Sequence, residues 1–499
     1  MRKKTSIVLP KILVEDYAAE GKSLARQDGK VIFIEQVVPG DVVDVRLQKN
    51  KKDWAEGHPV FFHEFSKDRV QPFCQHFGVC GGCQWQMLPY EKQLIYKQKQ
   101  VYDNLTRIGK IPIPDMLPIA GASETVYYRN KLEYTFSTRE FTPEKPPKDL
   151  SPNAGVKTTD REEDLVPFPG HQRAQGDTPS QRKHNAALGF HAKGFFDKIV
   201  DIQKCWLQAE PTNALRNALR DFAFQNKLSF YDIRNHTGLL RLLQVRVCTT
   251  GEIMVNIVFG EDNKKGIAEV MEFVRESFPE ITSLLYTVNL KWNDSLFDQE
   301  PVCFKGKDFI TEQLEDFQFK IGPKSFFQTN TRQGERLYQI TREFAELDGS
   351  QVVYDLYCGT GSIGIFCSKG ARKIIGVELV EAAVQDAREN ASINNIKDAL
   401  FFTGDVSEVC NEMFFAGHGK PDVIITDPPR AGMHEKLVRK ILEMEAPVVV
   451  YVSCNPATQA RDLNLLDEKY TVTKIQPVDM FPHTHHIENV VQLKLKRTN

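Results

Sequence analysis

Five short apolar segments in the last third of the chain constrain its fold more than any other feature. Each has the length of a β-strand and ends in a turn or a polar side chain, at residues 351–354, 373–377, 400–402, 422–426 and 448–453. Buried runs of this kind are typical of an open α/β sheet, and such sheets bind their ligands at the carboxyl ends of the strands. The residues that follow these segments are therefore expected to form a common site.

The last segment runs directly into Cys454, which is followed by Asn455 and Pro456 at the expected start of a helix. A thiol at this place lies where a substrate would bind, and the N-terminal end of a helix favours the thiolate form. Most free cysteines are small buried apolar residues, so the position alone does not make Cys454 a nucleophile. The side chains at the other strand ends decide between the two interpretations.

A glycine-rich turn follows the first segment, from Asp355 to Gly364. Its glycines allow a tight turn and a close approach to a nucleotide, and the spacing G-x-G-x-x-G also fits a nicotinamide dinucleotide. The second segment ends at Glu378, an acid placed to accept hydrogen bonds from a pair of ribose hydroxyls, and the third leads to Asp405. An enzyme with a nicotinamide cofactor is one interpretation of this pattern.

The fourth segment ends in Asp427-Pro428-Pro429-Arg430. The two prolines stiffen this loop and hold one carboxylate at the sheet edge, a feature that has no role in binding a pyrophosphate. The succession of glycine turn, ribose acid and Asp-Pro-Pro resembles the class I methyltransferases that depend on S-adenosylmethionine (SAM). This resemblance implies a doubly wound α/β domain in which these groups line the pockets for SAM and for the target.

Composition narrows the class of protein further. A chain of 499 residues is expected to form roughly two to four domains. It holds no apolar run long enough for a membrane span and no signal peptide, so we expect a cytoplasmic protein without a membrane partner. The net charge of −2 gives no sign of nucleic-acid binding by the whole surface, which leaves basic segments at 47–52, 92–110 and 494–497 as local candidates.

Three of the ten cysteines lie close together, at Cys74, Cys80 and Cys83, in a segment whose glycines allow the chain to curl around a centre. A cytosolic chain is not expected to use them for disulfides. Thiolate ligands in this spacing indicate a metal centre, and Cys205 is the candidate for a fourth ligand. Zinc and an iron-sulfur cluster both fit these ligands, and thiol redox chemistry at Cys80 and Cys83 is a third interpretation.

The residues that follow these cysteines carry a more specific resemblance. Cys80 to Gln86, followed by Tyr90, Gln93, Leu94 and Lys97, resembles the RNA uracil-C5 methyltransferases that carry a 4Fe-4S cluster. The same family matches Ser325 to Asn330, Asp355 to Gly361, Asp427 to Arg430, Ser453 to Pro456 and Phe481 to Glu488. The resemblance implies that the cluster ligands are Cys74, Cys80, Cys83 and Cys205.

The expected fold is multidomain. Residues 1–62 alternate apolar and polar positions between turn signals, which predicts a small β-barrel that resembles the OB-like, RNA-binding TRAM domain. Residues 63–322 are expected as an α+β central domain for the cluster and RNA, with a helical segment at 91–123 packed on the catalytic domain. Within them, residues 142–187 are rich in proline and poor in large apolar residues, which predicts a flexible insertion. Residues 323–499 form the expected SAM methyltransferase domain.

The chemistry of uracil explains why such an enzyme needs a thiol and a base. C5 of uracil is a weak nucleophile, and addition of a thiolate to C6 turns the ring into an enolate that can accept the methyl group. Cys454 is the expected thiolate. The adduct must then lose its C5 proton before the thiol can leave, and the resemblance assigns this base to Glu488. Without the family match, Glu488 would be a surface carboxylate ahead of a last strand at 490–495.

The resemblance also assigns the remaining site residues. Gln328 and Asp427 are expected to hold uracil and SAM, and Tyr357 and Glu378 are expected to contact SAM. We add Asp405 to the cofactor residues because it follows the third strand.

The substrate is expected to be RNA in a loop or an opened strand, because the target base has to leave its stack to reach the site. Within the family that this sequence resembles, the barrel and the cluster imply the branch that acts on 23S ribosomal RNA rather than the one that acts on transfer RNA, and a monomer is expected. Three rival functions are a nicotinamide dehydrogenase, a methyltransferase for exocyclic amines and a non-catalytic ribosome-assembly factor that binds RNA.

Overall fold

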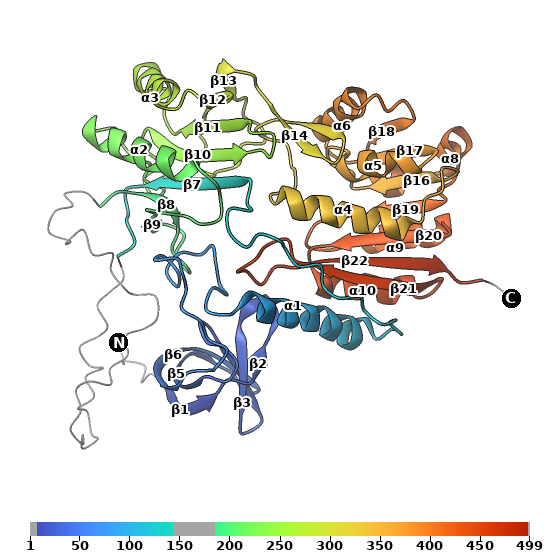
Figure 1. Cartoon of the computed structure of the whole chain (residues 1–499), viewed down its shortest axis with the longest axis horizontal. Helices are drawn as coiled ribbons and strands as arrows, with labels where there is room; N and C mark the ends of the chain where they lie inside the picture. Colours follow the sequence, from blue (N-terminus) through green and yellow to red (C-terminus); the bar gives the residue numbers. More distant parts are fainter. Residues whose placement is uncertain (1–6, 143–184, 498–499) are drawn as a thin grey trace.

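The computed structural model describes residues 7–142 and 185–497. In these residues a barrel, a central α+β body and a C-terminal α/β body follow one another along the chain (Figure 1). The predicted insertion at 142–187 lies almost wholly outside the described residues, and its last residue, Ala187, is the buried first residue of a strand. No helix in the two described ranges is long and apolar enough to cross a membrane.

The N-terminal barrel is one six-stranded sheet in the order β1-β5-β6-β4-β3-β2. A hydrogen bond from the N–H of Glu15 to the carbonyl of Leu24 (2.9 Å) joins the β1 side of the sheet to β3. Alternating side chains such as Ile32 and Val43 fill the interior, as the alternating pattern predicts. The strands are β1 (Val8–Leu13), β2 (Asp16–Tyr17), β3 (Ser23–Gln27), β4 (Lys30–Ile34), β5 (Val42–Asn50) and β6 (Trp54–Glu64).

The central body is a seven-stranded sheet in the order β13-β12-β11-β10-β7-β8-β9, with two helices whose side chains share its core. The stacked rings of Phe222 and Phe273 (centroids 4.0 Å apart) join these helices to each other. The elements are β7 (Lys131–Ser137), β8 (Ala187–His191), β9 (Ile199–Asp201), α2 (Thr212–Gln225), β10 (Leu240–Val247), β11 (Ile253–Phe259), α3 (Lys264–Ser277), β12 (Ser283–Val288) and β13 (Val302–Gly306). A hairpin of β14 (Ile310–Leu314) and β15 (Phe317–Ile321) leads into the C-terminal body.

The C-terminal body is a doubly wound sheet in the order β18-β17-β16-β19-β20-β22-β21, as predicted. The five strands from β18 to β20 are parallel, and β22 pairs antiparallel with β20. Separate apolar cores cover the two faces of the sheet. The strands are β16 (Val352–Leu356), β17 (Lys373–Glu378), β18 (Ala399–Thr403), β19 (Val423–Thr426), β20 (Val448–Ser453), β21 (Tyr470–Val478) and β22 (Glu488–Leu495). The helices are α4 (Thr331–Ala345), α5 (Ser362–Cys367), α6 (Glu381–Ile393), α7 (Val406–Val409), α8 (Glu412–His418), α9 (Glu435–Met444) and α10 (Pro456–Leu466).

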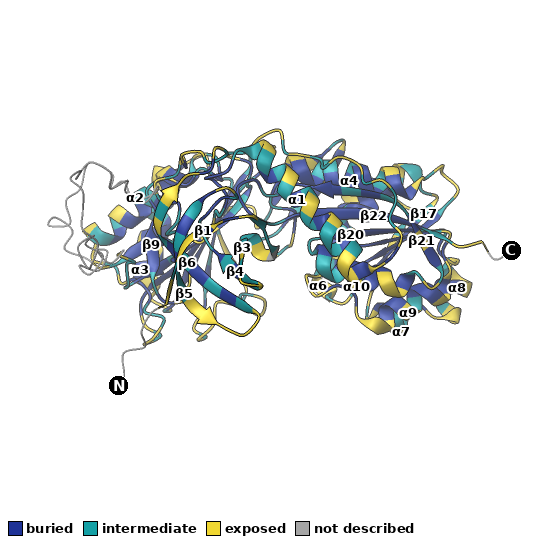
Figure 2. Ribbon diagram, turned by 90° about the horizontal axis from the view of Figure 1, so that it is seen from below, coloured by how far each residue is buried: buried dark blue, intermediate teal, exposed yellow. Residues whose placement is uncertain are grey.

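Helix α1 (Tyr90–Asn104) joins the barrel to the C-terminal body and continues as a π-helical turn at Leu105–Gly109. Its residue Val101 and the following Leu105 are fully buried in the same core as α9 and α10. In Figure 1 the helix lies along β21, β22 and α10, and Figure 2 shows buried strands at the centre of both lobes. A segment from the first quarter of the chain is therefore part of the C-terminal body.

Candidate active site

The predicted site residues meet at one edge of the C-terminal sheet. Tyr357, Glu378 and Asp405 lie at or after the ends of β16, β17 and β18, which form one half of the sheet. The other half carries Asp427 after β19, Cys454 after β20 and Glu488 as the first residue of β22. The chain order reverses between β16 and β19, and this is where open α/β sheets bind their ligands.

In the first half, the glycine turn is open toward the sheet edge. Tyr357 (φ 62°), Gly359 (φ 52°) and Gly361 (φ 77°) have left-handed backbones, and a Cβ added at Gly359 would meet no atom within 4 Å. Glu378 holds the turn in place, because its carboxylate accepts hydrogen bonds from the N–H of Gly359 (3.2 Å) and of Val380 (3.0 Å). This open turn beside an acid fits the ribose and amino-acid portions of SAM.

Asp405 is a local capping residue at the same edge. Its carboxylate accepts a hydrogen bond from the N–H of Ser407 (2.8 Å) at the start of α7, and the Ser407 side chain and backbone lower the pKa of Asp405. The carboxylate is therefore ionised at neutral pH and able to accept hydrogen bonds from a ligand.

Asp355 belongs to the glycine motif but was not predicted as a site residue. The expected strand at 351–354 extends to Leu356, because Asp355 pairs with Gly376 on one side and Ile425 on the other. The buried carboxyl accepts a hydrogen bond from Gly364 (2.8 Å) through Oδ2, whereas its Oδ1 has no partner among the described residues. Burial raises the pKa of Asp355 to about 7. An unpartnered polar atom below the glycine turn is a further feature that fits a bound cofactor.

In the second half, the strand register brings Cys454 and Glu488 together. Ser453 of β20 pairs with Asn489 of β22, so the next residue on each strand, Cys454 and Glu488, lie opposite each other. Glu488 is 7% exposed and is not the surface carboxylate ahead of a strand at 490–495, because β22 begins at Glu488 itself. Burial and the nearby Asp427 raise the pKa of Glu488 well above its usual value.

The surroundings of Cys454 in the ligand-free protein favour the thiol over the expected thiolate. Burial, Glu488 and Asp427 together raise the pKa of Cys454 to about 11, although α10 starts two residues later. Burial also raises the pKa of Asp427 to about 7. The loss of water around the thiol and the two nearby carboxyl groups raise its pKa by more than the N-terminal end of α10 lowers it. The thiol is therefore protonated at neutral pH.

Arg430 is the cationic group that opposes this effect, and the sequence analysis gave it no role. It lowers the pKa of both Cys454 and Glu488. Its backbone carbonyl accepts hydrogen bonds from the side chains of Asn455 (3.0 Å) and Thr458 (3.2 Å), which fix the Asp-Pro-Pro-Arg loop against the start of α10. The sequence motif contains Arg430, but only the fold shows that it lies near the thiol of Cys454.

Gln328 reaches the site from the segment before α4. Its backbone carbonyl accepts a hydrogen bond from the side chain of Asn130 (2.9 Å), and the carbonyl of Thr329 accepts one from the N–H of Asn130 (2.7 Å). Asn130 lies directly before β7, so the central body positions this segment. Gln328 is buried, whereas the nearby Phe326 is 71% exposed.

The four predicted metal ligands line one cavity of about 670 Å³. Cys74, Cys80, Cys83 and Cys205 face it, and burial, with a smaller contribution from neighbouring thiols, raises the pKa of the first three. Within residues 7–142 and 185–497, no group of three or more ligating side chains is close enough together to hold one metal ion. The thiols therefore surround a shared space without meeting at a single point.

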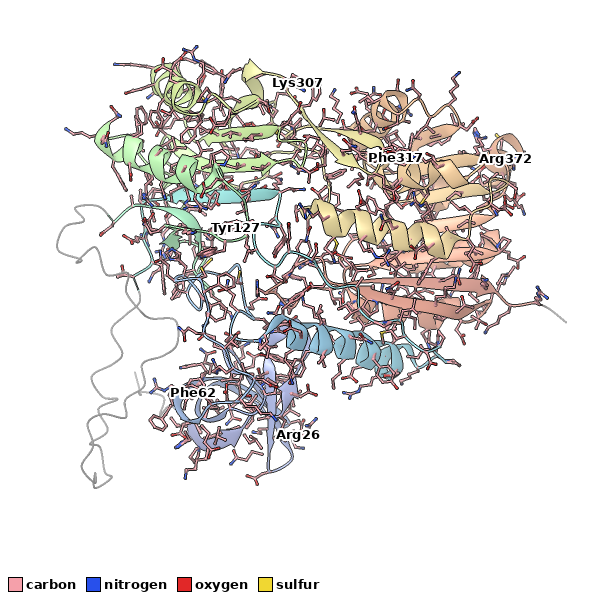
Figure 3. All side chains as sticks on the ribbon, viewed as in Figure 1. Arg26, Phe62, Tyr127, Lys307, Phe317 and Arg372 are labelled. Atoms are coloured by element: carbon pink, nitrogen blue, oxygen red, sulfur yellow. The ribbon has the colours of Figure 1, made fainter. Side chains whose placement is uncertain are left out.

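The same cavity extends to the active-site edge and is lined by cationic side chains. They are Arg129, Lys131, Lys204, Arg246, Lys324 and Arg430. Nη1 of the buried Arg246 has no hydrogen-bond partner among the described residues. Aromatic rings lie between these cations, including Trp206, over which Lys204 stacks at 3.7 Å from the ring centroid. Tyr127, labelled in Figure 3, contacts Trp206 with ring centroids 5.8 Å apart.

Comparisons with known proteins show the family of this chain. Residues 298–496 match the family model of tRNA (Uracil-5-)-methyltransferase, and residues 11–60 match the TRAM domain. A Bacteroides thetaiotaomicron protein described as an RNA methyltransferase is 50% identical over 96% of this chain and 100% of its own length. A Porphyromonas gingivalis protein of the same description is 45% identical over 96% of this chain and 98% of its own length.

A solved structure also matches nearly the whole chain. It is the Pyrococcus abyssi tRNA (uracil-54, C5)-methyltransferase in complex with S-adenosyl-L-homocysteine. The two are 28% identical, with a TM-score of 0.71 over 97% of this chain and 100% of the other. The similarity includes the N-terminal barrel and the central body as well as the C-terminal sheet.

Proposed function

As a member of the RNA uracil-5 methyltransferase family, this enzyme uses SAM, and we propose that it methylates C5 of a uridine in 23S ribosomal RNA through a covalent bond between Cys454 and C6. The observation that carries this proposal is the strand register that sets Cys454 opposite Glu488. Both lie at the sheet edge that also holds the glycine turn. This register supports the proposal, because addition, methylation and elimination require a nucleophile and a base close together and beside the cofactor.

The proposed reaction starts with transfer of the Cys454 thiol proton to solvent and attack of the sulfur on C6. The C5–C6 electron pair then moves toward O4 and leaves C5 nucleophilic. C5 would take the electrophilic methyl group that SAM supplies, and S-adenosylhomocysteine would leave. Glu488 removes the remaining C5 proton, the C5–C6 double bond re-forms and the C6–S bond breaks, which returns Cys454 as a thiolate.

The groups around Cys454 bear on the first and last steps. The thiol is protonated in the free enzyme because burial, Glu488 and Asp427 raise its pKa, and Arg430 opposes them. A base for the C5 proton has to be ionised when the adduct has formed, and Arg430 lowers the pKa of Glu488 in that direction. In this proposal Gln328 and Asp427 hold uracil and SAM, and Tyr357, Glu378 and Asp405 hold SAM.

The cavity beside the site supports RNA as the substrate. It is lined by six cations and one carboxylate, Glu133, which is paired with Lys131 (2.8 Å). Phosphate groups require such cations, and exposed aromatic rings such as Phe326 can stack on unpaired bases. The partner proposed for this cavity is single-stranded RNA next to the target uridine.

We also propose that Cys74, Cys80, Cys83 and Cys205 hold a 4Fe-4S cluster. Four thiols around one cavity fit a cluster better than zinc, because several metal atoms hold their ligands further apart than one ion does. Protein purified without oxygen should contain about four irons per chain and absorb visible light. Cys80→Ser should lose this iron, whereas the exposed Cys303→Ser should keep it. Stoichiometric zinc without iron in the native protein would refute the cluster.

Transfer RNA is the second candidate substrate, and a specific observation favours it. The Pyrococcus abyssi enzyme, which acts on uracil 54 of tRNA, matches this chain over 97% of its length. A barrel and a central body therefore do not by themselves exclude tRNA. Mapping of 5-methyluridine in 23S rRNA and tRNA from cells with and without the gene separates the two, because only the true substrate loses the modification.

The covalent mechanism is tested with two variants that act on opposite sides of methyl transfer. Cys454→Ala should give neither 5-methyluridine nor a protein–RNA adduct. Glu488→Gln should add and methylate but resolve slowly, so denaturing gels should show an RNA adduct that carries the SAM methyl group. The adduct should be absent from the double variant. Product formation by Cys454→Ala would refute the mechanism, and normal turnover by Glu488→Gln would refute the base.

A further inference from the structure

The loop that ends in Glu488 is held by residues from far away in the sequence. This loop, the 479–488 loop, runs from the end of β21 to the first residue of β22. Its residue His483 has a left-handed backbone (φ 65°), a conformation that side chains other than glycine adopt only where their surroundings impose it. The contacts that impose it come largely from residues 84–97.

Lys97 of α1 makes a fully buried contact with the start of this loop. Its ammonium donates hydrogen bonds to Oδ1 of Asp479 (2.6 Å) and to the carbonyl of Phe481 (3.1 Å). The same Asp479 oxygen accepts a hydrogen bond from the N–H of Phe481 (3.0 Å). Both charged side chains are 0% exposed. A buried ion pair contributes little net stability, so its effect here is to fix the geometry of the start of the loop.

Gln93, one helical turn before Lys97, holds the middle of the loop. Its Oε1 accepts a hydrogen bond from the N–H of His483 (2.8 Å), and its Nε2 lies 3.2 Å from Nδ1 of the same histidine. Nε2 also donates to the carbonyl of Leu88 (2.8 Å), which fixes the orientation of the amide. Gln93 is 0% exposed, so water cannot replace these partners.

The segment before α1 completes the contact. The N–H groups of Gln84 (2.8 Å) and Trp85 (3.0 Å) both donate to the carbonyl of His483. Oε1 of Gln84 lies 2.7 Å from Nδ1 of His485. Gln84 directly follows Cys83, so the cysteine segment is continuous with the residues that hold the 479–488 loop.

We propose that Lys97 and Gln93 are positioning residues for the removal of the C5 proton, because they fix the loop that sets Glu488 opposite Cys454. This inference rests on the proposed function, in which Glu488 is the base. It deepens that function by extending the catalytic arrangement to a helix about 390 residues away in sequence.

The two halves of the reaction depend on these contacts differently. Cys454 follows β20 and is fixed by α10, whose N-cap Asn455 accepts a hydrogen bond from Ala457 (3.1 Å). Addition to C6 therefore needs neither Lys97 nor Gln93. A displacement of about 1 Å at a reacting group can slow its step by about 100-fold. Loosening of the 479–488 loop should thus slow the decay of the adduct and spare its formation.

The test uses two variants designed to fold. Gln93→Met keeps the length of the side chain without its hydrogen bonds. Lys97→Met combined with Asp479→Leu replaces the buried ion pair by apolar side chains, an exchange that proteins commonly tolerate. Gln100→Met on the same helix is the matched control. With enzyme in excess over labelled RNA and with SAM present, rapid quenching and denaturing gels give the rate constants for formation and decay of the adduct.

We expect both variants to form the adduct within about threefold of the wild-type rate and to resolve it about 10- to 100-fold more slowly. The KM for RNA should be unchanged. Wild-type decay in both variants would overturn the inference. A reduced amplitude with unchanged rate constants would also overturn it, because that result indicates only a smaller folded fraction. Glu488→Gln in the same assay tests the proposed function separately from the inference. If Glu488→Gln accumulates no adduct, the role of Glu488 as the base is refuted. If Glu488→Gln accumulates an adduct and the positioning variants accumulate none, only the inference is refuted.

Discussion

The two halves of the sheet edge hold their acidic groups in different ways. On the half proposed to bind SAM, the SAM side, Glu378 and Asp405 accept hydrogen bonds from backbone N–H groups, and the carboxylate of Asp405 has a lowered pKa. On the half proposed to bind uracil, the uracil side, burial raises the pKa of Asp427 and Glu488, and that of Cys454 rises with them. The SAM side thus offers carboxylates held by local hydrogen bonds to a ligand. On the uracil side, the raised pKa values favour the neutral forms of Asp427, Glu488 and Cys454 in the free protein.

This difference follows from what each half has to do. A cofactor with ribose hydroxyls is held by ionised acceptors, which local turns supply at little cost in desolvation. A nucleophile and a base in one small pocket influence each other, because each charge raises the energy of the next. Their ionisation is therefore coupled, and it depends on the distant residues that set their separation.

The largest expected effect is on the affinity for S-adenosylhomocysteine, which should depend on the SAM side and not on the uracil side. Glu378→Ala should weaken binding of S-adenosylhomocysteine about 100-fold, because hydrogen bonds to a charged group contribute about 1.5–3 kcal/mol each and the glycine turn loses its anchor. Cys454→Ala should bind it within about twofold of wild type. Titration calorimetry without RNA measures both affinities.

Glu381→Ala provides the control for this comparison. Glu381 is an exposed carboxylate in the first turn of α6, three residues after Glu378, and it bonds to Arg388 (3.4 Å). Its replacement should leave the affinity unchanged. Equal losses in Glu378→Ala and Cys454→Ala would show that the halves do not act separately.

The same contrast decides how much of the site could be predicted from sequence. The glycine turn, Glu378 and Asp405 follow their own strands directly, so local pattern placed them correctly at the sheet edge. Glu488 was assigned by family resemblance, and its burial as the first residue of β22 could not be predicted, because it depends on pairing with β20 and β21.

The cationic cavity was missed for a related reason. The basic segments expected to bind RNA include Lys97, Lys99 and Lys494, and the structure pairs all of these with carboxylates. The cations that do line the cavity come from separate segments around residues 129–131, 204, 246, 324 and 430. Single basic residues far apart in sequence give no pattern, and only the packing of the central body against the C-terminal body gathers them.

Asp355 lies on β16 at the boundary between the halves and gives the second expected effect. Folding raises its pKa from 3.8 to about 7, so the folded state favours the protonated form. Its contribution to stability is therefore lost as pH rises through that window. Asp355→Asn should remove about 2 kcal/mol of the difference in unfolding free energy between about pH 5.5 and about pH 7.5.

Urea unfolding without SAM measures this difference. Asp398→Asn is the control, since Asp398 is an exposed carboxylate between α6 and β18. The other buried carboxyl groups keep part of the pH dependence in the Asp355→Asn variant, so the slope should fall without vanishing. An unchanged slope would show that Asp355 is ionised in the folded protein.

The smallest expected effect concerns Arg430, a cation that acts on Cys454. Arg430 lowers the pKa of Cys454, so Arg430→Met should move that pKa further above about 11. A shift of about one unit reduces the thiolate fraction about tenfold at any pH below it. The rate of alkylation of Cys454 by iodoacetamide, followed by mass spectrometry across pH without RNA, reports this fraction directly. Arg439→Met controls for the loss of one positive charge, because Arg439 is exposed on α9 and pairs with Glu435 (2.7 Å).

Glu488→Gln should shift the dependence of the alkylation rate on pH in the opposite direction, since Glu488 raises the pKa of the Cys454 thiol. Opposite shifts in the two variants would establish that the reactivity of Cys454 is set by these two neighbours, whereas equal curves in all variants would leave burial alone as the cause.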